Sequence, residues 1–159
     1  MQNGMAKNKF TYTILEGVPS AAQLDEILEV YKSIFEDYKL EFFKSRIHEK
    51  QDLLIILCFD GEQLVGFKIG YTYNENTFYS WVGGILPKYR RLGIAKTLAA
   101  TQEKIVIAKG YQKLRTKSMN RFKPMMILNL RNGFDIVKVY TNDSGQTKII
   151  FEKELTTLS

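Results

Sequence analysis

Residues 85–96 bring together side chains and backbone features that could bind a phosphorylated ligand. A strand-like run ends at Pro87, and an amphipathic run begins at Ile94, with Gly93 and the small Ala95 at the start of the expected helix. Small residues there let backbone N–H groups approach an anion, and a helix N-terminus adds partial positive charge. The flanking cations are Arg90, Arg91 and Lys96. This spacing predicts a pyrophosphate site.

Composition argues against several other chemistries. The 159 residues include one cysteine, Cys58, and one histidine, His48, which are too few for an internal disulfide or a structural zinc site. Cys58 lies in an apolar run and is expected to be buried, whereas His48 lies in a charged stretch typical of a solvated helix face. The absence of G-x-x-x-x-G-K-[ST] argues against a nucleoside triphosphatase, and G-x-G-x-x-G is also missing. We expect no metal site.

Two motifs carry a resemblance to a known family. The run Arg90-Arg91-Leu92-Gly93-Ile94-Ala95 resembles the Q/R-x-x-G-x-G/A acyl-CoA motif of the GCN5-related N-acetyltransferase (GNAT) superfamily, and Pro87 stands where that family usually has a proline. Asn132-Gly133-Phe134 resembles the G-F that ends the family's fourth helix and opens its sixth strand. The resemblance covers residues 10–155. It implies an acetyl-CoA-dependent N-acetyltransferase that moves an acetyl group directly to a primary amine in a ternary complex.

The resemblance also implies where acetyl-CoA, the acyl donor, would bind. The backbone of the fourth strand would pair with the pantetheine arm at Gly83, Gly84 and Ile85. The pyrophosphate would lie against Arg90, Arg91, Leu92, Gly93, Ile94, Ala95 and Lys96. Asn120 is the candidate for an asparagine that contacts the cofactor after the fifth strand. We also expect Gly83-Gly84 to mark a bulge that separates the fourth and fifth strands.

Two catalytic positions of the family are changed in this chain. The usual glutamate base on the fourth strand is replaced by Trp81, and the usual thiolate-protonating tyrosine by Asn129. Asn129 could still donate a hydrogen bond to the cofactor sulfur. We therefore expect catalysis to rest on positioning and on stabilisation of the thioester oxyanion.

Candidates for contact with the acceptor come from two regions. Ser80 and Tyr79 flank Trp81, and the acidic residues Glu36, Asp37 and Glu41 lie between the first two expected helices, where they would suit a cationic amine. The alternative for each is ordinary packing or a solvated surface. The strand aromatics are candidates either for a pocket wall or for the core: Tyr71, Tyr73, Phe78, Tyr79 and Trp81.

The net charge of +6 is distributed unevenly along the chain. Residues 88–123 carry eleven basic residues and one acidic residue, a net charge of +10. The rest of the chain carries 12 basic and 16 acidic residues, a net charge of −4. Such a segment attracts a polyanion, and we assign it first to the phosphorylated cofactor, with residues 113–123 toward the 3′-phosphate. Nucleic-acid binding is less favoured because aromatics are sparse among these cations.

The elements that must position these residues alternate between strand and helix periodicity. Strands are expected at residues 10–15, 53–59, 64–73, 77–86, 113–119, 136–141 and 148–154. Helices are expected after an N-cap at Ser20, at 41–49, at 94–108 with one face formed by Ile94, Leu98, Thr101, Ile105 and Ala108, and at 125–132. The order β-α-α-β-β-β-α-β-α-β-β predicts an α/β (α+β) fold with a mixed, mostly antiparallel sheet of about seven strands flanked by about four helices.

Organisation and location follow from what the chain does not contain. No apolar stretch reaches the 18 residues of a membrane span, and the polar N-terminus lacks the apolar core of a signal peptide, so a cytoplasmic protein is expected. We expect one acyl-CoA-binding domain over residues 1–159, with residues 1–9 flexible and a homodimer left open. Besides the transferase, the alternative is a GNAT-fold acyl-CoA-binding module with little or no activity.

Overall fold

A computed structural model describes residues 9–156. Its strands are β1 (Phe10–Glu16), β2 (Leu54–Asp60), β3 (Gln63–Asn74), β4 (Thr77–Ile85), β5 (Lys113–Met119), β6 (Asp135–Thr141) and β7 (Thr147–Glu154). Its helices are α2 (Ala21–Ile34), α3 (Leu40–Glu49), α4 (Ile94–Ala108) and α5 (Lys123–Arg131), with a short 3-10 helix, η1 (Pro87–Tyr89). The predicted order of strands and helices is confirmed, and η1 is the one added element. Residues 1–8 of the segment expected to be flexible lie outside the described residues, while Lys9 lies 3.6 Å from the Asp60 carboxylate.

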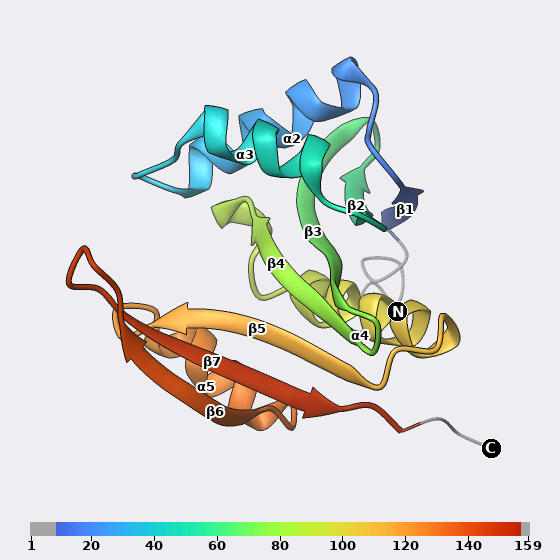
Figure 1. The fold of residues 1–159 in the computed structure, drawn as a ribbon. Helices are drawn as coiled ribbons and strands as arrows, with labels where there is room; N and C mark the ends of the chain where they lie inside the picture. The colour runs from blue at the N-terminus through green and yellow to red at the C-terminus, as the bar shows by residue number, and fades with distance from the viewer. Residues whose placement is uncertain (1–8, 157–159) are drawn as a thin grey trace.

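The seven strands form one sheet in the order β1-β2-β3-β4-β5-β7-β6. All neighbouring pairs are antiparallel except β4 and β5, which are parallel and pair over only three positions, ending at Tyr79 and Arg115. A hydrogen bond from the Thr116 hydroxyl to the Ser80 carbonyl, 2.9 Å long, follows that last pair. Beyond it the two strands separate (Figure 1). The sheet therefore consists of two halves joined at a narrow seam.

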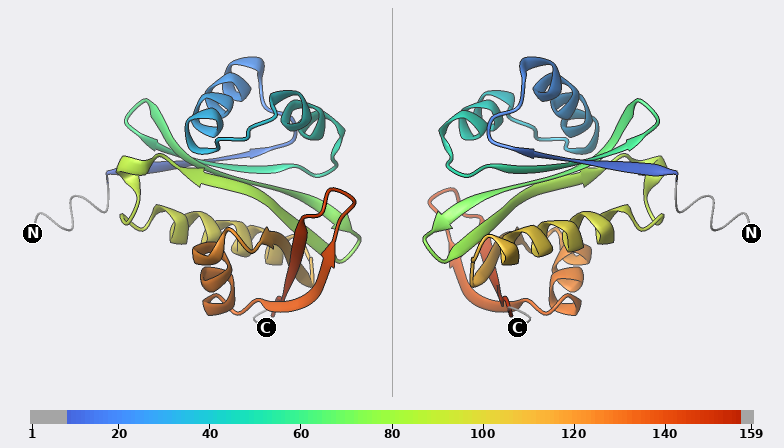
Figure 2. Two further views of the ribbon diagram at one scale, coloured as in Figure 1. Left: turned by 90° about the vertical axis from the view of Figure 1, so that its left-hand side faces the viewer. Right: turned by 90° about the vertical axis from the view of Figure 1, so that its right-hand side faces the viewer.

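Helices cover both faces of the sheet. The pair α2 and α3 lies on one face, and α4 and α5 lie on the other (Figure 2). Buried side chains of α2, α3 and the first strands form the largest core cluster, including Ile27, Phe43 and Phe67. Cys58 is buried in a second cluster under α4, as predicted, and His48 is exposed, also as predicted. No helix within residues 9–156 is long and apolar enough to cross a membrane.

Local sequence explains how α2 begins. The Ser20 side chain accepts a hydrogen bond from the Gln23 backbone at 3.1 Å, and the Gln23 side chain accepts one from the Ser20 backbone at 2.9 Å. This capping box satisfies two N–H groups that the helix leaves unpaired. The predicted N-cap is confirmed, and the start of α2 fixes which of its residues face the sheet.

The bulge in β4 differs from the prediction. It does not lie at Gly83-Gly84, because the register shifts between the pairs Ile69–Val82 and Gly70–Ser80, which leaves Trp81 as the extra residue. Gly84 has another role: a Cβ there would lie 2.8 Å from Cδ1 of Ile34, so its absence lets α2 approach the strand. The bulge therefore precedes the free edge of β4.

The buried stripe of α4 also differs from the prediction. Ile94 and Leu98 face the sheet as expected, and Ile105 is partly buried against the core. The fully buried stripe, however, continues through Gln102 and Val106, while Thr101 is only half-buried and Ala108 is exposed. The spacing of i, i+4, i+8 and i+12 follows the slow drift of an α-helical face. Gln102 is fully buried, and neither atom of its amide has a hydrogen-bond partner among the described residues.

Candidate functional site

The loop between β4 and α4 is built to receive an anion. Gly93 is the N-cap of α4 with φ +85°, no side chain caps the helix, and its first turn contains no acidic residue. The amides of that turn are therefore unpaired and point out of the helix end. Arg91 also has a positive φ of 64°, a conformation that costs a non-glycine residue energy and is concentrated at functional sites.

Contacts behind the loop hold it in place. The Tyr89 hydroxyl donates to the Asp60 carboxylate at 2.6 Å, and this hydrogen bond raises the pKa of Tyr89. Nε of Arg90 donates to the Ile85 carbonyl at 3.2 Å, which ties the loop to the end of β4. Arg91 and Lys96 form no ion pair with a carboxylate of residues 9–156. Their charges are available to a ligand.

The edge of β4 facing β5 is the second element of the site. Gly83, Gly84 and Ile85 pair with β3 on one side, while no strand of the described chain pairs with them on the other. An extended ligand could therefore add hydrogen bonds along this edge, as a further strand would. The edge leads directly to the loop at Arg90, so the two elements form one continuous surface.

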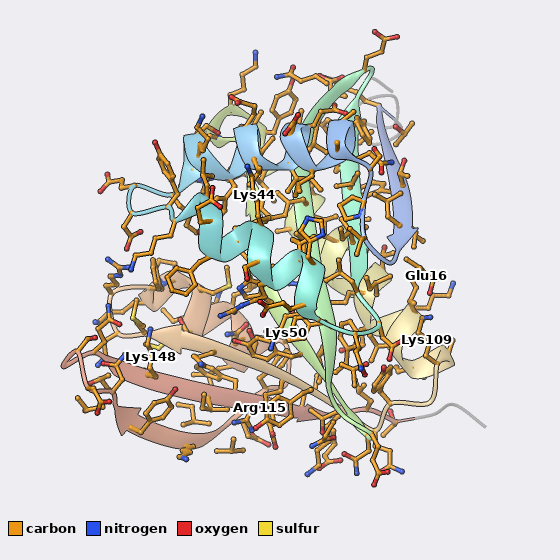
Figure 3. All side chains as sticks on the ribbon, turned by 45° about the horizontal axis from the view of Figure 1, so that its top comes forward. Glu16, Lys44, Lys50, Lys109, Arg115 and Lys148 are labelled. Atoms are coloured by element: carbon orange, nitrogen blue, oxygen red, sulfur yellow. The ribbon has the colours of Figure 1, made fainter. Side chains whose placement is uncertain are left out.

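A cavity of about 440 Å³ lies beside the point where β4 and β5 separate, on the face covered by α3. Five cationic side chains line it: Arg46, Lys50, Arg115, Lys117 and Lys138. Four tyrosines line it as well: Tyr71, Tyr73, Tyr79 and Tyr140. Thr72 and Ile150 complete the lining, which contains no carboxylate. Figure 3 shows Lys50 at the end of α3 and Arg115 on the strand below.

Burial sets the protonation of the tyrosines. Burial raises the pKa of Tyr79 to about 12, with the hydroxyl of Tyr71 adding to the shift. The pKa of Tyr71 is raised by the same cause, although Arg46 opposes the shift. Both hydroxyls therefore stay protonated at neutral pH and can donate hydrogen bonds, but neither is a base there.

The residues predicted for catalysis lie apart from this cavity. Glu41 is exposed at the start of α3, and Ser80 is buried on the α4 side of the sheet, because its register partner Gly70 faces Gln102 of α4. Among the α5 residues, all of which the structure describes, Asn129 alone is buried. None of the three lines the cavity, and their catalytic roles stay predictions.

The acidic residues expected to attract a cationic amine also lie elsewhere. Asp37 pairs with Arg121 at 2.9 Å, and the hydrogen bond from that guanidinium lowers the pKa of Asp37. Glu36 and Glu41 are exposed and outside the cavity lining. The pair links the α2–α3 loop to the turn after β5, so the carboxylate of Asp37 already has a cationic partner.

The cations of residues 113–123 have different partners, and their assignment to the 3′-phosphate stays a prediction. Lys113 pairs with Glu154, and Arg115 pairs with Glu152. Lys117 faces the cavity, and Lys123 donates to the Asn120 carbonyl at 2.8 Å. Lys113, Arg115 and Lys117 stand at alternate positions of β5 and therefore share one face. Their partners differ because the register with β7 places Glu154 and Glu152 opposite the first two and Ile150 opposite Lys117. Asn120 itself lies exposed in a shallow hollow with Arg121 and Gln146.

Sequence reasoning missed the cations and Tyr140 of the cavity, although a signal was present. Three of the contributing strands carry a pair of lining residues at i and i+2: Tyr71 and Tyr73 on β3, Arg115 and Lys117 on β5, and Lys138 and Tyr140 on β6. A period of two places both side chains of each pair on one face. Of the aromatic candidates, Phe78 is in the core, and Trp81 packs against Phe43 with ring centroids 4.8 Å apart.

Comparisons with known proteins agree with this geometry. The model of the acetyltransferase (GNAT) family matches residues 21–124. No curated protein matches the sequence. Among solved structures, the ribosomal-protein-S18-alanine N-acetyltransferase from Escherichia coli is similar with a TM-score of 0.77 and 15% identity, over 94% of this chain and 97% of that one.

Two further structures carry a bound ligand. The PaiA N-acetyltransferase from Thermoplasma acidophilum, in complex with coenzyme A, matches with a TM-score of 0.65 and 24% identity, over 89% of this chain and 99% of that one. A GNAT family acetyltransferase from Elizabethkingia anophelis, with acetyl-CoA bound, matches with a TM-score of 0.71 and 17% identity, over 91% and 98% of the two chains.

Proposed function

The chain belongs to the GNAT family of acetyltransferases, and we propose that it transfers an acetyl group from acetyl-CoA to a primary amine within a ternary complex. The observation that carries the proposal is the β4–α4 loop, with uncapped helix amides at Gly93 and the cations Arg91 and Lys96, which pair with no carboxylate of residues 9–156. The proposal takes residues 1–159 as one acyl-CoA-binding domain that acts in the cytoplasm.

The chain's residues fit acetyl-CoA as a substrate at two places. The first-turn amides of α4 with Arg91 and Lys96 would hold the pyrophosphate, since oriented N–H donors and cations both favour an anion. The free edge of β4 at Gly83, Gly84 and Ile85 would hold the pantetheine arm. Bound there, acetyl-CoA supplies the reactive thioester beside the cavity.

The rest of the catalytic effect must come from positioning the amine beside the thioester. The cavity lining contains no carboxylate, and the hydroxyl of Tyr79 stays protonated, so the amine has to reach the thioester in its neutral form and lose its proton to water. Holding the amine and the acyl group together replaces a bimolecular encounter and accounts for a large share of the rate. Asn129 is kept as the candidate donor to the leaving sulfur.

Isothermal titration with acetyl-CoA tests the proposal. We expect Lys96→Gln to raise the Kd about tenfold, because it removes one charge-assisted contact worth about 1.5 kcal/mol. The matched control is Lys104→Gln, which changes an exposed lysine further along the same helix and should leave the Kd unchanged. No binding of acetyl-CoA at millimolar concentration would disprove the proposal.

The second candidate is an acyl-CoA-binding module with little or no activity. It is favoured by Trp81 and Asn129 at the positions where the family usually has its base and its acid. A panel of amines, assayed for release of the CoA thiol, separates the two candidates. Amine-dependent release supports the transferase, and binding without release supports the module.

A further inference from the structure

We propose that the acceptor amine carries an anionic group, a carboxylate or a phosphate, which the cationic cavity beside the β4–β5 opening binds. The inference rests on the acetyltransferase function proposed above and names the chemical class of its acceptor. It reverses the expectation from sequence of a cationic acceptor.

The charge balance of the cavity is the first argument. Of its five cations, Arg115 pairs with Glu152 at 2.7 Å. The other four form no ion pair with a carboxylate of residues 9–156: Arg46, Lys50, Lys117 and Lys138. Asp52, which does not line the cavity, accepts a hydrogen bond from the lining residue Thr72 at 3.0 Å. A polyamine would meet like charges there, whereas an oxyanion would meet charge-assisted donors.

The position of the cations is the second argument. They come from three separate elements, the end of α3, β5 and β6. Figure 3 shows two of them, Lys50 and Arg115. Aromatic rings contact two of the charged groups. Arg46 lies 4.9 Å from the ring centroid of Trp81, and Lys138 lies 5.4 Å from the ring centroid of Tyr140. Cation–π contacts of this kind restrict the side chains before a ligand arrives. A restricted donor set loses less entropy on binding.

The chemistry of the amine is the third argument. Nearby positive charge disfavours the ammonium form and lowers the pKa of the acceptor's amine. The same cations that bind the anionic group would therefore increase the neutral fraction of the amine, in a cavity that offers no carboxylate as base. The neutral amine nitrogen adds to the thioester carbonyl, and the C–S bond then breaks as CoA leaves as a thiolate. The amine proton passes to water, and the thiolate takes a proton from water. A volume of about 440 Å³ suits a small molecule.

Matched pairs of amines test the inference. Phosphoethanolamine is compared with ethanolamine, and 4-aminobutyrate with butylamine, by release of the CoA thiol at saturating acetyl-CoA. Spermidine serves as the polycationic arm. We expect kcat/KM to be at least about tenfold higher for the anionic member of one pair, since a charge-assisted contact contributes that much. The pair that shows the larger ratio distinguishes phosphate from carboxylate.

Variants link that preference to the cavity. Lys117→Gln and Lys138→Gln should each reduce the ratio about tenfold through a higher KM for the anionic amine, with the KM for acetyl-CoA unchanged. Lys104→Gln, on the opposite face of the sheet, should keep the ratio. The inference is overturned if spermidine, ethanolamine or butylamine is the preferred acceptor, or if Lys117→Gln leaves the ratio of kcat/KM values unchanged.

Failure of the proposed function would give a different result. If no amine is acetylated, the transferase proposal fails, and direct titration with phosphoethanolamine and with 4-aminobutyrate then judges the cavity. If either probe binds, and its Kd rises about tenfold in Lys117→Gln, the result supports a ligand with an anionic group. Absence of binding to the unchanged protein overturns it.

Discussion

Replacing Gly93 by alanine tests whether the geometry of the β4–α4 loop, rather than its charge alone, binds the cofactor. Gly93 has φ +85°, and a Cβ added there would have no atom within 4 Å. The substitution therefore causes no clash, and its cost comes from the backbone conformation. Gly110, just beyond the other end of α4, has φ +94° and equally open surroundings, which makes Gly110→Ala a matched control.

The expected magnitudes follow from these conformations. A left-handed conformation costs an alanine about 1–2 kcal/mol, and restriction of the unfolded chain returns roughly 0.4–1 kcal/mol. Both variants should thus lose about 1 kcal/mol of stability, which lowers Tm by about 2–4 °C in a domain of this size. Only Gly93→Ala should also weaken acetyl-CoA binding. Relaxation of its φ would misalign the first-turn amides, and one lost charge-assisted hydrogen bond raises Kd about tenfold.

Two measurements decide the outcome. Thermal denaturation compares the stability of the two variants, and titration with acetyl-CoA compares their affinities. Equal affinities in Gly93→Ala and Gly110→Ala would refute the reasoning, because the loop conformation would then have no part in binding. A much larger loss of stability in Gly93→Ala would contradict the open surroundings on which the comparison rests.

Three further predictions concern the core. Gly70→Ala should cost about 3 kcal/mol, because the new Cβ would lie 2.4 Å from the Phe78 ring and 2.6 Å from the Tyr79 carbonyl; Gly66→Ala, with neighbours at 3.4 Å, is the tolerated control in urea unfolding. Gln102→Leu should raise stability by about 1 kcal/mol, since it removes a buried amide without partners; a lower Tm would show that the amide is satisfied. Burial lowers the pKa of Lys68 from 10.5 to about 8, so below pH 8 folding bears the full cost of burying the charge. Lys68→Met should therefore stabilise the protein by about 2 kcal/mol at pH 7. That gain should shrink between pH 8 and 10.5, because Lys68 has lost its proton in the folded wild-type protein there but still binds it in the unfolded chain. A gain in stability that does not change with pH would contradict this prediction.

The sequence by itself determined the local features. The N-cap at Ser20, the glycine at the start of α4 and the Gly133 that follows α5 depend on residues close together in the chain, so their types suffice to predict them. The order of strands and helices follows for the same reason, because periodicity is a local property. The β4–α4 loop proposed to bind the pyrophosphate belongs to this class, since its candidate donors lie within a few residues.

Tertiary structure alone decided which side chains meet. The choice of Gln102 over Thr101 for the buried face of α4 depends on how the helix rotates against the sheet, which its own period does not specify. The bulge at Trp81 depends on the register between β3 and β4. The cavity joins Arg46, Lys117 and Lys138 from three distant segments, and their common face is set by the pairing of β5, β7 and β6. The basic residues of β5 share one face, but Lys113 and Arg115 pair with glutamates whereas Lys117 lies opposite Ile150, because the register between β5 and β7 decides which residue stands beside each cation.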